Sequence, residues 1–153
     1  MKRNQRGFTL IEILVVIGIL AVLFAIALVA INPARQFSQA NDTKRRSDVN
    51  ALLNAIHQYA ADNKGALPLA IGTTALTVGN GTGEADICAA LVTKYLAALP
   101  RDPLTTGGDI TDCVATYTTS YMVVKSATDN RITVSAKGEV DNSAGLYNIT
   151  VTR

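Results

Sequence analysis

The sequence predicts an α+β protein in which one long N-terminal helix packs on a small antiparallel β-sheet. Three observations predict this fold class. Residues 8–31 form an almost unbroken apolar run, residues 34–63 continue with a one-sided helical pattern, and residues 114–152 contain segments that alternate between apolar and polar side chains. The length of 153 residues suits a single domain, and the 17% of charged residues is low because the apolar run contains almost none.

The apolar run is long enough to cross a membrane. It has 24 residues, of which all but Thr9, Glu12 and Gly18 are apolar. As a helix it would span roughly 36 Å, which exceeds the ~30 Å of a hydrocarbon core. Three basic residues precede it, and they should hold the N-terminus in the cytoplasm while the rest is exported: Lys2, Arg3 and Arg6. An ordinary secretory signal has a shorter apolar region, so we expect an apolar transmembrane helix over 8–33.

Glu12 does not fit a simple membrane anchor. A carboxylate five residues into an apolar helix costs a few kcal/mol unless something compensates for it, although the helix N-terminus nearby favours an anion. A cation at the same depth on another chain would be a better partner. Cleavage after Gly7 would create one, because Phe8 would then carry an α-amino group. Such a pair would set the axial register of neighbouring helices.

The segment Gly7-Phe8-Thr9-Leu10-Ile11-Glu12 lies between a short basic leader and a long apolar helix. In this context it resembles the processing site of type IV pilins and type II secretion pseudopilins, and the resemblance extends well over residues 1–63. In that family a prepilin peptidase cuts after the glycine and methylates the new N-terminus. The resemblance therefore implies that residues 1–7 are a leader, that Phe8 becomes the N-methylated terminus, and that Glu12 is the assembly carboxylate. It also implies a pilin-like fold.

The same resemblance implies a structural subunit of a filament, whose core the apolar helix forms. Its partners would be identical or related pilin subunits, prepilin peptidase, and the pilus or type II secretion assembly machinery. Before assembly the chain would cross the inner membrane once, with its C-terminus outside, and it would end in an extracellular or periplasmic filament. Two alternatives stay open: a minor pilin at the filament tip that serves adhesion or DNA uptake, and a signal-anchored surface protein that does not assemble.

The head is expected over residues 34–153, beginning with an amphipathic helix over 34–63. At its start, Asn32 and Pro33 either kink one continuous helix or cap a new one, with Pro33 in the first position. One apolar stripe runs along this helix and should cover the sheet: Val49, Leu52, Leu53, Ile56, Tyr59 and Ala60. The basic run Lys44-Arg45-Arg46 is interpreted as a solvated face, and the alternative is a contact with another subunit or with lipid headgroups.

The rest of the head should hold one short helix and the sheet. Residues 84–99 carry apolar side chains at helical spacing, and Pro100 follows them. Residues 114–125, 131–137 and 145–152 alternate and are separated by turns, which predicts an antiparallel meander. A further short strand is expected over 75–78.

Cys88 and Cys113 are the two cysteines of the chain. In an exported protein an isolated pair usually forms a disulfide, which predicts a Cys88–Cys113 bond. Closing a loop of about 26 residues would stabilise the head by roughly 3.5 kcal/mol. The alternative is two buried thiols.

The segment Leu99-Pro100-Arg101-Asp102-Pro103-Leu104 resembles the stretch that leads into the sheet of major pseudopilins. In those proteins the following loop holds a calcium ion. Asp102, Asp109 and Asp112 offer the hard oxygen ligands that calcium prefers, so the resemblance makes them candidate ligands. The alternative is a turn or a solvated loop. No other cofactor is expected.

The composition argues against catalysis and against nucleic-acid binding. The chain has one histidine, and its two cysteines are expected to be bonded, so the sequence offers no catalytic set of nucleophile and base. Beyond the apolar run, 11 basic residues balance 11 acidic ones. A neutral head lacks the basic character that nucleic-acid binding needs.

Overall fold

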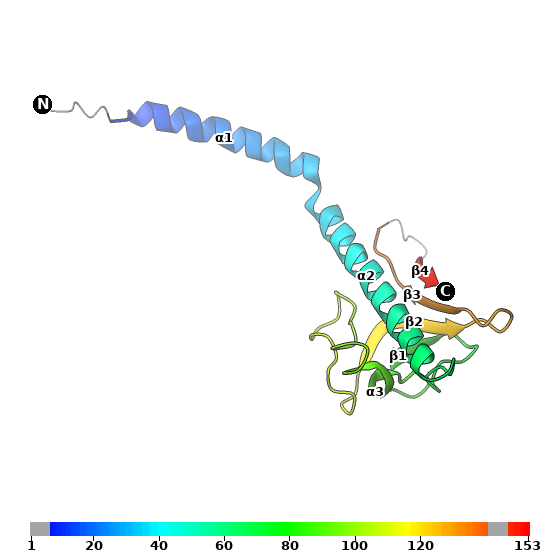
Figure 1. Cartoon of the computed structure of the whole chain (residues 1–153). Coiled ribbons are helices and arrows are strands. Elements are labelled where there is room, and N and C mark those ends of the chain that lie inside the picture. Colours follow the sequence, from blue (N-terminus) through cyan, green and yellow to red (C-terminus); the bar gives the residue numbers. More distant parts are fainter. Residues whose placement is uncertain (1–6, 141–146) are drawn as a thin grey trace, which may run out of the picture. The chain divides into compact units, whose positions relative to one another are not determined.

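A computed structural model describes residues 7–140 and 147–153. The chain divides into two compact units, Met1–Phe37 and Ser38–Arg153, and Figure 1 gives the order of the elements along it. The leader expected over 1–7 lies outside the described residues except for Gly7. The observed elements make an α+β fold of long helices and a small antiparallel sheet, which confirms the predicted fold class.

The first unit is dominated by α1, which spans Leu10–Ile31. Thr9 caps its start, because the hydroxyl of Thr9 accepts the N–H of Glu12 and the Glu12 carboxylate accepts the N–H of Thr9. Every residue of α1 is exposed within this chain. Among the described residues it is the one helix long and apolar enough to cross a membrane.

A change of helix occurs at Asn32. Its left-handed backbone, with φ at 46°, ends α1, and its side-chain oxygen accepts the N–H of Arg35. The next helix, α2, therefore starts at Pro33 and runs to Asp62. Of the two interpretations of this position, the capped new helix is confirmed. At the other end, Gly65 adopts a φ of 89° and donates its N–H to the carbonyl of Ala60, which stops the helix as predicted.

The head contains one four-stranded antiparallel sheet in the order β1-β2-β3-β4. The strands are β1 (Leu76–Gly79), β2 (Thr118–Lys125), β3 (Ile132–Ala136) and β4 (Ile149–Thr152). The predicted meander is confirmed, with β1 added at its edge. The first strand of the meander begins later than expected, because the carboxylate of Asp112 holds the N–H groups of Val114 and Ala115 in a turn. Part of the segment expected over 145–152, namely 145–146, lies outside the described residues.

The predicted cover of the sheet is also confirmed. Side chains of α2 and of the strands belong to one apolar core, which includes Val49, Leu52, Leu53, Ile56, Tyr121, Val123 and Val134. The hydroxyl of Tyr121 donates to a carboxylate oxygen of Asp48 on α2 at 2.7 Å. Within the head, this bond adds a polar link between helix and sheet.

The helix expected over 84–99 is wrong in its length. Only Cys88–Leu91 is helical (α3), and the chain leaves the helix at Val92, whose ψ is 144°. Thr93 then takes a φ of 73°, and Leu99 exchanges both backbone hydrogen bonds with Ile110 at 2.8 Å. The apolar side chains of this segment are nevertheless buried, among them Ile87, Leu91 and Leu99. The spacing thus identified core residues, while the backbone follows the turn at Thr93 and the pairing of Leu99 with Ile110.

Candidate functional site

The start of α1 brings together the residues expected to direct processing and assembly. Glu12 Oε2 accepts two hydrogen bonds from Thr9, one from its N–H and one from its hydroxyl, each at 2.8 Å. Phe8 is 85% exposed and, like Gly7, precedes the helix. The chain itself therefore satisfies part of the hydrogen-bonding capacity of Glu12 with neutral donors.

The surface of α1 indicates which surroundings this helix requires. Glu12 is the one ionisable residue between Leu10 and Ile31, and large apolar side chains project all round the helix. Apolar surface of this extent is unfavourable in water, so it requires lipid or other apolar helices as its surroundings.

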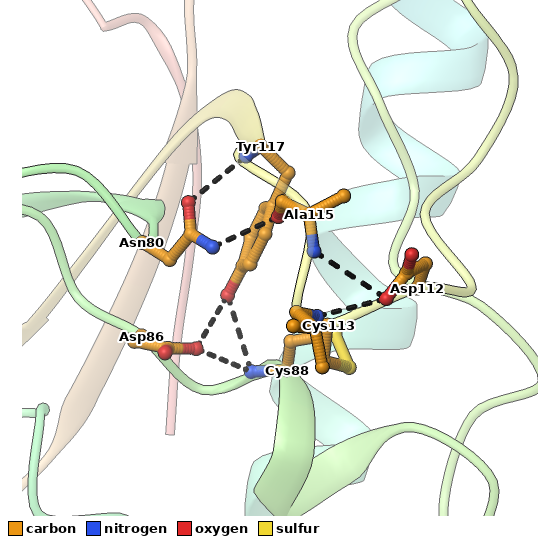
Figure 2. The surroundings of a disulfide bond; sticks show 8 residues. Asn80, Asp86, Cys88, Asp112, Cys113, Ala115 and Tyr117 are labelled. Atoms are coloured by element: carbon orange, nitrogen blue, oxygen red, sulfur yellow. Dashed lines mark hydrogen bonds between the residues drawn. A yellow bond between two sulfur atoms is a disulfide. The ribbon is translucent and has the colours of Figure 1, made fainter.

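The predicted disulfide between Cys88 and Cys113 is confirmed, with the two Cα atoms 5.4 Å apart. Figure 2 shows the hydrogen bonds that surround it. The Tyr117 hydroxyl donates to Asp86 Oδ1 at 2.7 Å, and the N–H of Cys88 donates to the same carboxylate oxygen and to the Tyr117 hydroxyl oxygen. Burial and the neighbouring Asp86 carboxylate raise the pKa of Tyr117, so its hydroxyl remains protonated and can donate.

Asn80 continues this network on the other side of Tyr117. Its side-chain amide donates to the carbonyl of Ala115 and accepts the N–H of Tyr117, both at 2.9 Å. The segment from Cys113 to Tyr117 is thus fixed to the loop after β1 and to α3, by hydrogen bonds as well as by the covalent bond (Figure 2).

The sequence interpretation missed a charged cluster centred on Arg45. The side chain of Arg45 is 2% exposed. Its Nε and Nη2 donate to the two carboxylate oxygens of Asp102 at 2.7 and 3.0 Å. Its Nη1 donates to Asp42 Oδ1 at 2.8 Å and to Glu139 Oε1 at 2.6 Å. One guanidinium therefore joins three carboxylates from three separate segments of the head.

Asp42 extends this cluster to the backbone after β3. Its two carboxylate oxygens accept the N–H groups of Glu139 and Val140 at 2.8 and 2.9 Å. The cluster thereby holds residues 139–140 against α2.

The expectation of a solvated face for Lys44-Arg45-Arg46 is wrong for Arg45, although Lys44 and Arg46 are exposed. A sequence signal existed. Arg45 lies four residues before Val49, and Asp42 lies seven residues before Val49. Both therefore extend the buried stripe of α2 toward the N-terminus of the helix.

The structure does not gather the three candidate calcium ligands. Asp102 faces Arg45 and also accepts the N–H of Leu104. Asp109 accepts the N–H of Arg101 at 3.2 Å, while Asp112 accepts the N–H of Val114 at 2.9 Å. In the described part of the chain, no group of three or more His, Cys, Asp or Glu residues is placed to hold a metal ion.

The Arg45 cluster should make the head sensitive to acid. Burial would raise the pKa values of Asp42 and Asp102, but hydrogen bonds from backbone N–H groups and from Arg45 outweigh it, so both pKa values are lowered. A lowered pKa in the folded state contributes stability that is present above the unfolded value of about 3.9 and is lost as the pH falls through the folded value. We expect the free energy of unfolding to fall steeply below about pH 4.

Urea denaturation over a pH series measures this effect. Asp102→Asn should make the free energy of unfolding depend less on pH, because asparagine does not take up a proton when the head unfolds in acid. An equally steep loss in the variant would contradict the assignment to Asp102.

Comparison with known proteins places these features in a family. Residues 2–28 match the model of the prokaryotic N-terminal methylation motif. The chain is 37% identical to type II secretion system core protein G of Aeromonas hydrophila over 102 residues, which are 67% of this chain and 69% of that protein. The core protein G of Dickeya chrysanthemi is 30% identical over 154 residues, covering 97% of this chain and 90% of its own length.

A pilus protein is similar over a shorter stretch. The type IV wide pilus major component PilA4 of Thermus thermophilus is 41% identical over 61 residues, which are 40% of this chain and 45% of that protein. No solved structure gives a significant match. The motif, the nearly full-length similarity to core protein G and the long helix with its small antiparallel sheet show that the chain belongs to the type IV pilin and type II secretion pseudopilin family, whose members are structural filament subunits and not enzymes.

Proposed function

We propose that the chain is a structural subunit of a type IV pilus-like filament or a type II secretion pseudopilus. Prepilin peptidase would cut after Gly7 and methylate Phe8, and the pilus or secretion machinery would assemble the mature chain from the inner membrane. The N-terminus would lie in the cytoplasm before cleavage, because three basic residues precede the apolar run. The observation that carries the proposal is Glu12, a lone carboxylate in the first turn of an otherwise apolar, fully exposed helix.

The capping geometry explains how Glu12 can serve two states. Before assembly, Thr9 supplies two neutral donors to its carboxylate, which lowers the cost of placing the charge in lipid. In a filament, the α-amino group of a neighbouring subunit's Phe8 would replace them with a full positive charge. A charge-assisted hydrogen bond is roughly twice as strong as a neutral one, so assembly would be favoured.

The fold does not require a glycine at residue 7, which supports a role for Gly7 in cleavage. A Cβ atom at this position would meet no atom within 4 Å, and the backbone needs no positive φ there. Folding therefore gives no reason for a glycine at residue 7. Recognition by a prepilin peptidase, which in this family cuts after the glycine, would supply one.

Glu12→Gln tests the proposal, because glutamine keeps the shape and the capping hydrogen bonds but removes the charge. We expect cleavage after Gly7 and methylation of Phe8 to be unchanged by mass spectrometry. The assembled fraction in sheared filament preparations should fall about tenfold or more, since each 1.4 kcal/mol lost lowers association tenfold. Ile13→Leu, an apolar exchange at the next position, is the matched control and should assemble normally.

Normal filaments from Glu12→Gln would refute the role of the charge. Immunogold labelling of wild-type filaments addresses the subunit class: a major subunit labels the whole length, while a minor pilin labels only the tip. Deletion of the gene separates the two kinds of filament, because loss of protein secretion indicates a pseudopilus and loss of surface fibres indicates a pilus.

A further inference from the structure

The family resemblance makes Asp102, Asp109 and Asp112 candidate calcium ligands, but these carboxylates have other partners in the head. Asp102 uses both oxygens on Arg45, and Asp109 and Asp112 each accept backbone N–H groups of their own loop. Calcium needs six to eight oxygen ligands that converge on one point. These three residues do not fit that requirement.

We propose that the side chain of Arg45 takes the place of a metal ion in this head, so that the Asp102 region binds no calcium and the fold does not depend on it. The positive charge that joins the acidic segments is then a permanent part of the chain.

The geometry of the cluster supports this substitution. The guanidinium lies among the carboxylates of Asp42, Asp102 and Glu139, with nitrogen–oxygen distances of 2.6 to 3.0 Å. Those residues belong to α2, to the loop before β2 and to the segment after β3. A bridging metal ion would have the same task of holding separate segments together through their carboxylates.

The guanidinium of Arg45 stays protonated. Burial would favour the neutral form, but hydrogen bonds to Asp102, Glu139 and Asp42 outweigh it and raise the pKa of the guanidinium further. Its side chain is 2% exposed, so solvent ions cannot displace it from Asp102 without opening the head. A chelator that strips calcium from a metal-dependent head has nothing to remove here.

Thermal unfolding of the full chain in detergent micelles, followed by circular dichroism, tests the proposal. We expect the same Tm in EGTA and in excess calcium chloride, and no heat of calcium binding in titration calorimetry. A Tm that rises by several degrees with calcium, or calcium binding that Asp102→Asn abolishes, would overturn it. Asp109→Asn with Asp112→Asn is the matched control and should leave the insensitivity to calcium unchanged.

Arg45→Ala provides a second test, because it removes the cation and leaves a space beside three carboxylates. Calcium should raise the Tm of this variant but not that of the wild type. A folded variant that calcium fails to stabilise would contradict the substitution of arginine for metal. If the variant does not fold, the calcium titration of the wild type alone tests the proposal. Both tests use unassembled protein, so their outcome is independent of the proposed filament.

Discussion

Arg45→Met should lower the free energy of unfolding of the head by about 3–5 kcal/mol, the usual cost of removing one partner from a buried ion cluster. Methionine fills much of the volume but leaves Asp42 and Asp102, both less than a tenth exposed, without their cation. It also weakens the attachment of residues 139–140, which Asp42 holds through their N–H groups.

Urea denaturation followed by tyrosine fluorescence measures the loss, since the chain has five tyrosines and no tryptophan. Arg46→Met is a matched control, because Arg46 is the next residue on α2 and is exposed. Its effect should remain within about 0.5 kcal/mol. Equal effects of the two substitutions would show that the cluster does not stabilise the head.

Removing the disulfide by Cys88→Ala with Cys113→Ala should cost about 3–4 kcal/mol. The bond closes a loop between residues 25 apart in the sequence. Its loss frees the unfolded chain more than the folded one, where the contacts of Asp86, Asn80 and Tyr117 persist. Alanine is preferable to serine, because Cys88 is fully buried and a hydroxyl there would need a new partner.

Reduction of the wild type provides the comparison for this experiment. Denaturation with and without dithiothreitol should show the same difference as the double substitution, while dithiothreitol should not change the double variant. A reduced wild type as stable as the oxidised protein would contradict the prediction.

Periodicity predicted the parts of the fold in which burial repeats regularly. The stripe from Val49 to Ile56 and the alternation in β2 both follow from one buried face, so helix, sheet and their packing could be derived from residue spacing. The segment 84–99 shows the limit of this reasoning. Its spacing marked the buried side chains, but it does not contain the turn at Thr93, whose N–H donates to the carbonyl of Leu96, or the pairing of Leu99 with Ile110.

The Arg45 cluster was missed for a related reason. Three consecutive basic residues look like a solvated face, and the partners Asp102 and Glu139 lie 57 and 94 residues away in the sequence. The sequence shows that Arg45 continues the apolar stripe, but not that carboxylates meet it there. The motif around Glu12 could be recognised because all its residues are consecutive.

The apolar surface of α1 has a consequence for how copies of the chain could pack. Apart from Glu12, the helix presents no polar side that would distinguish one direction around its axis from another. A single carboxylate can fix the axial position of the helix relative to its neighbours. The apolar contacts of the rest of the helix, however, would be nearly the same after a rotation of the helix about its axis. If copies of the chain assemble through α1, we therefore expect contacts between their heads to set the angle of each subunit.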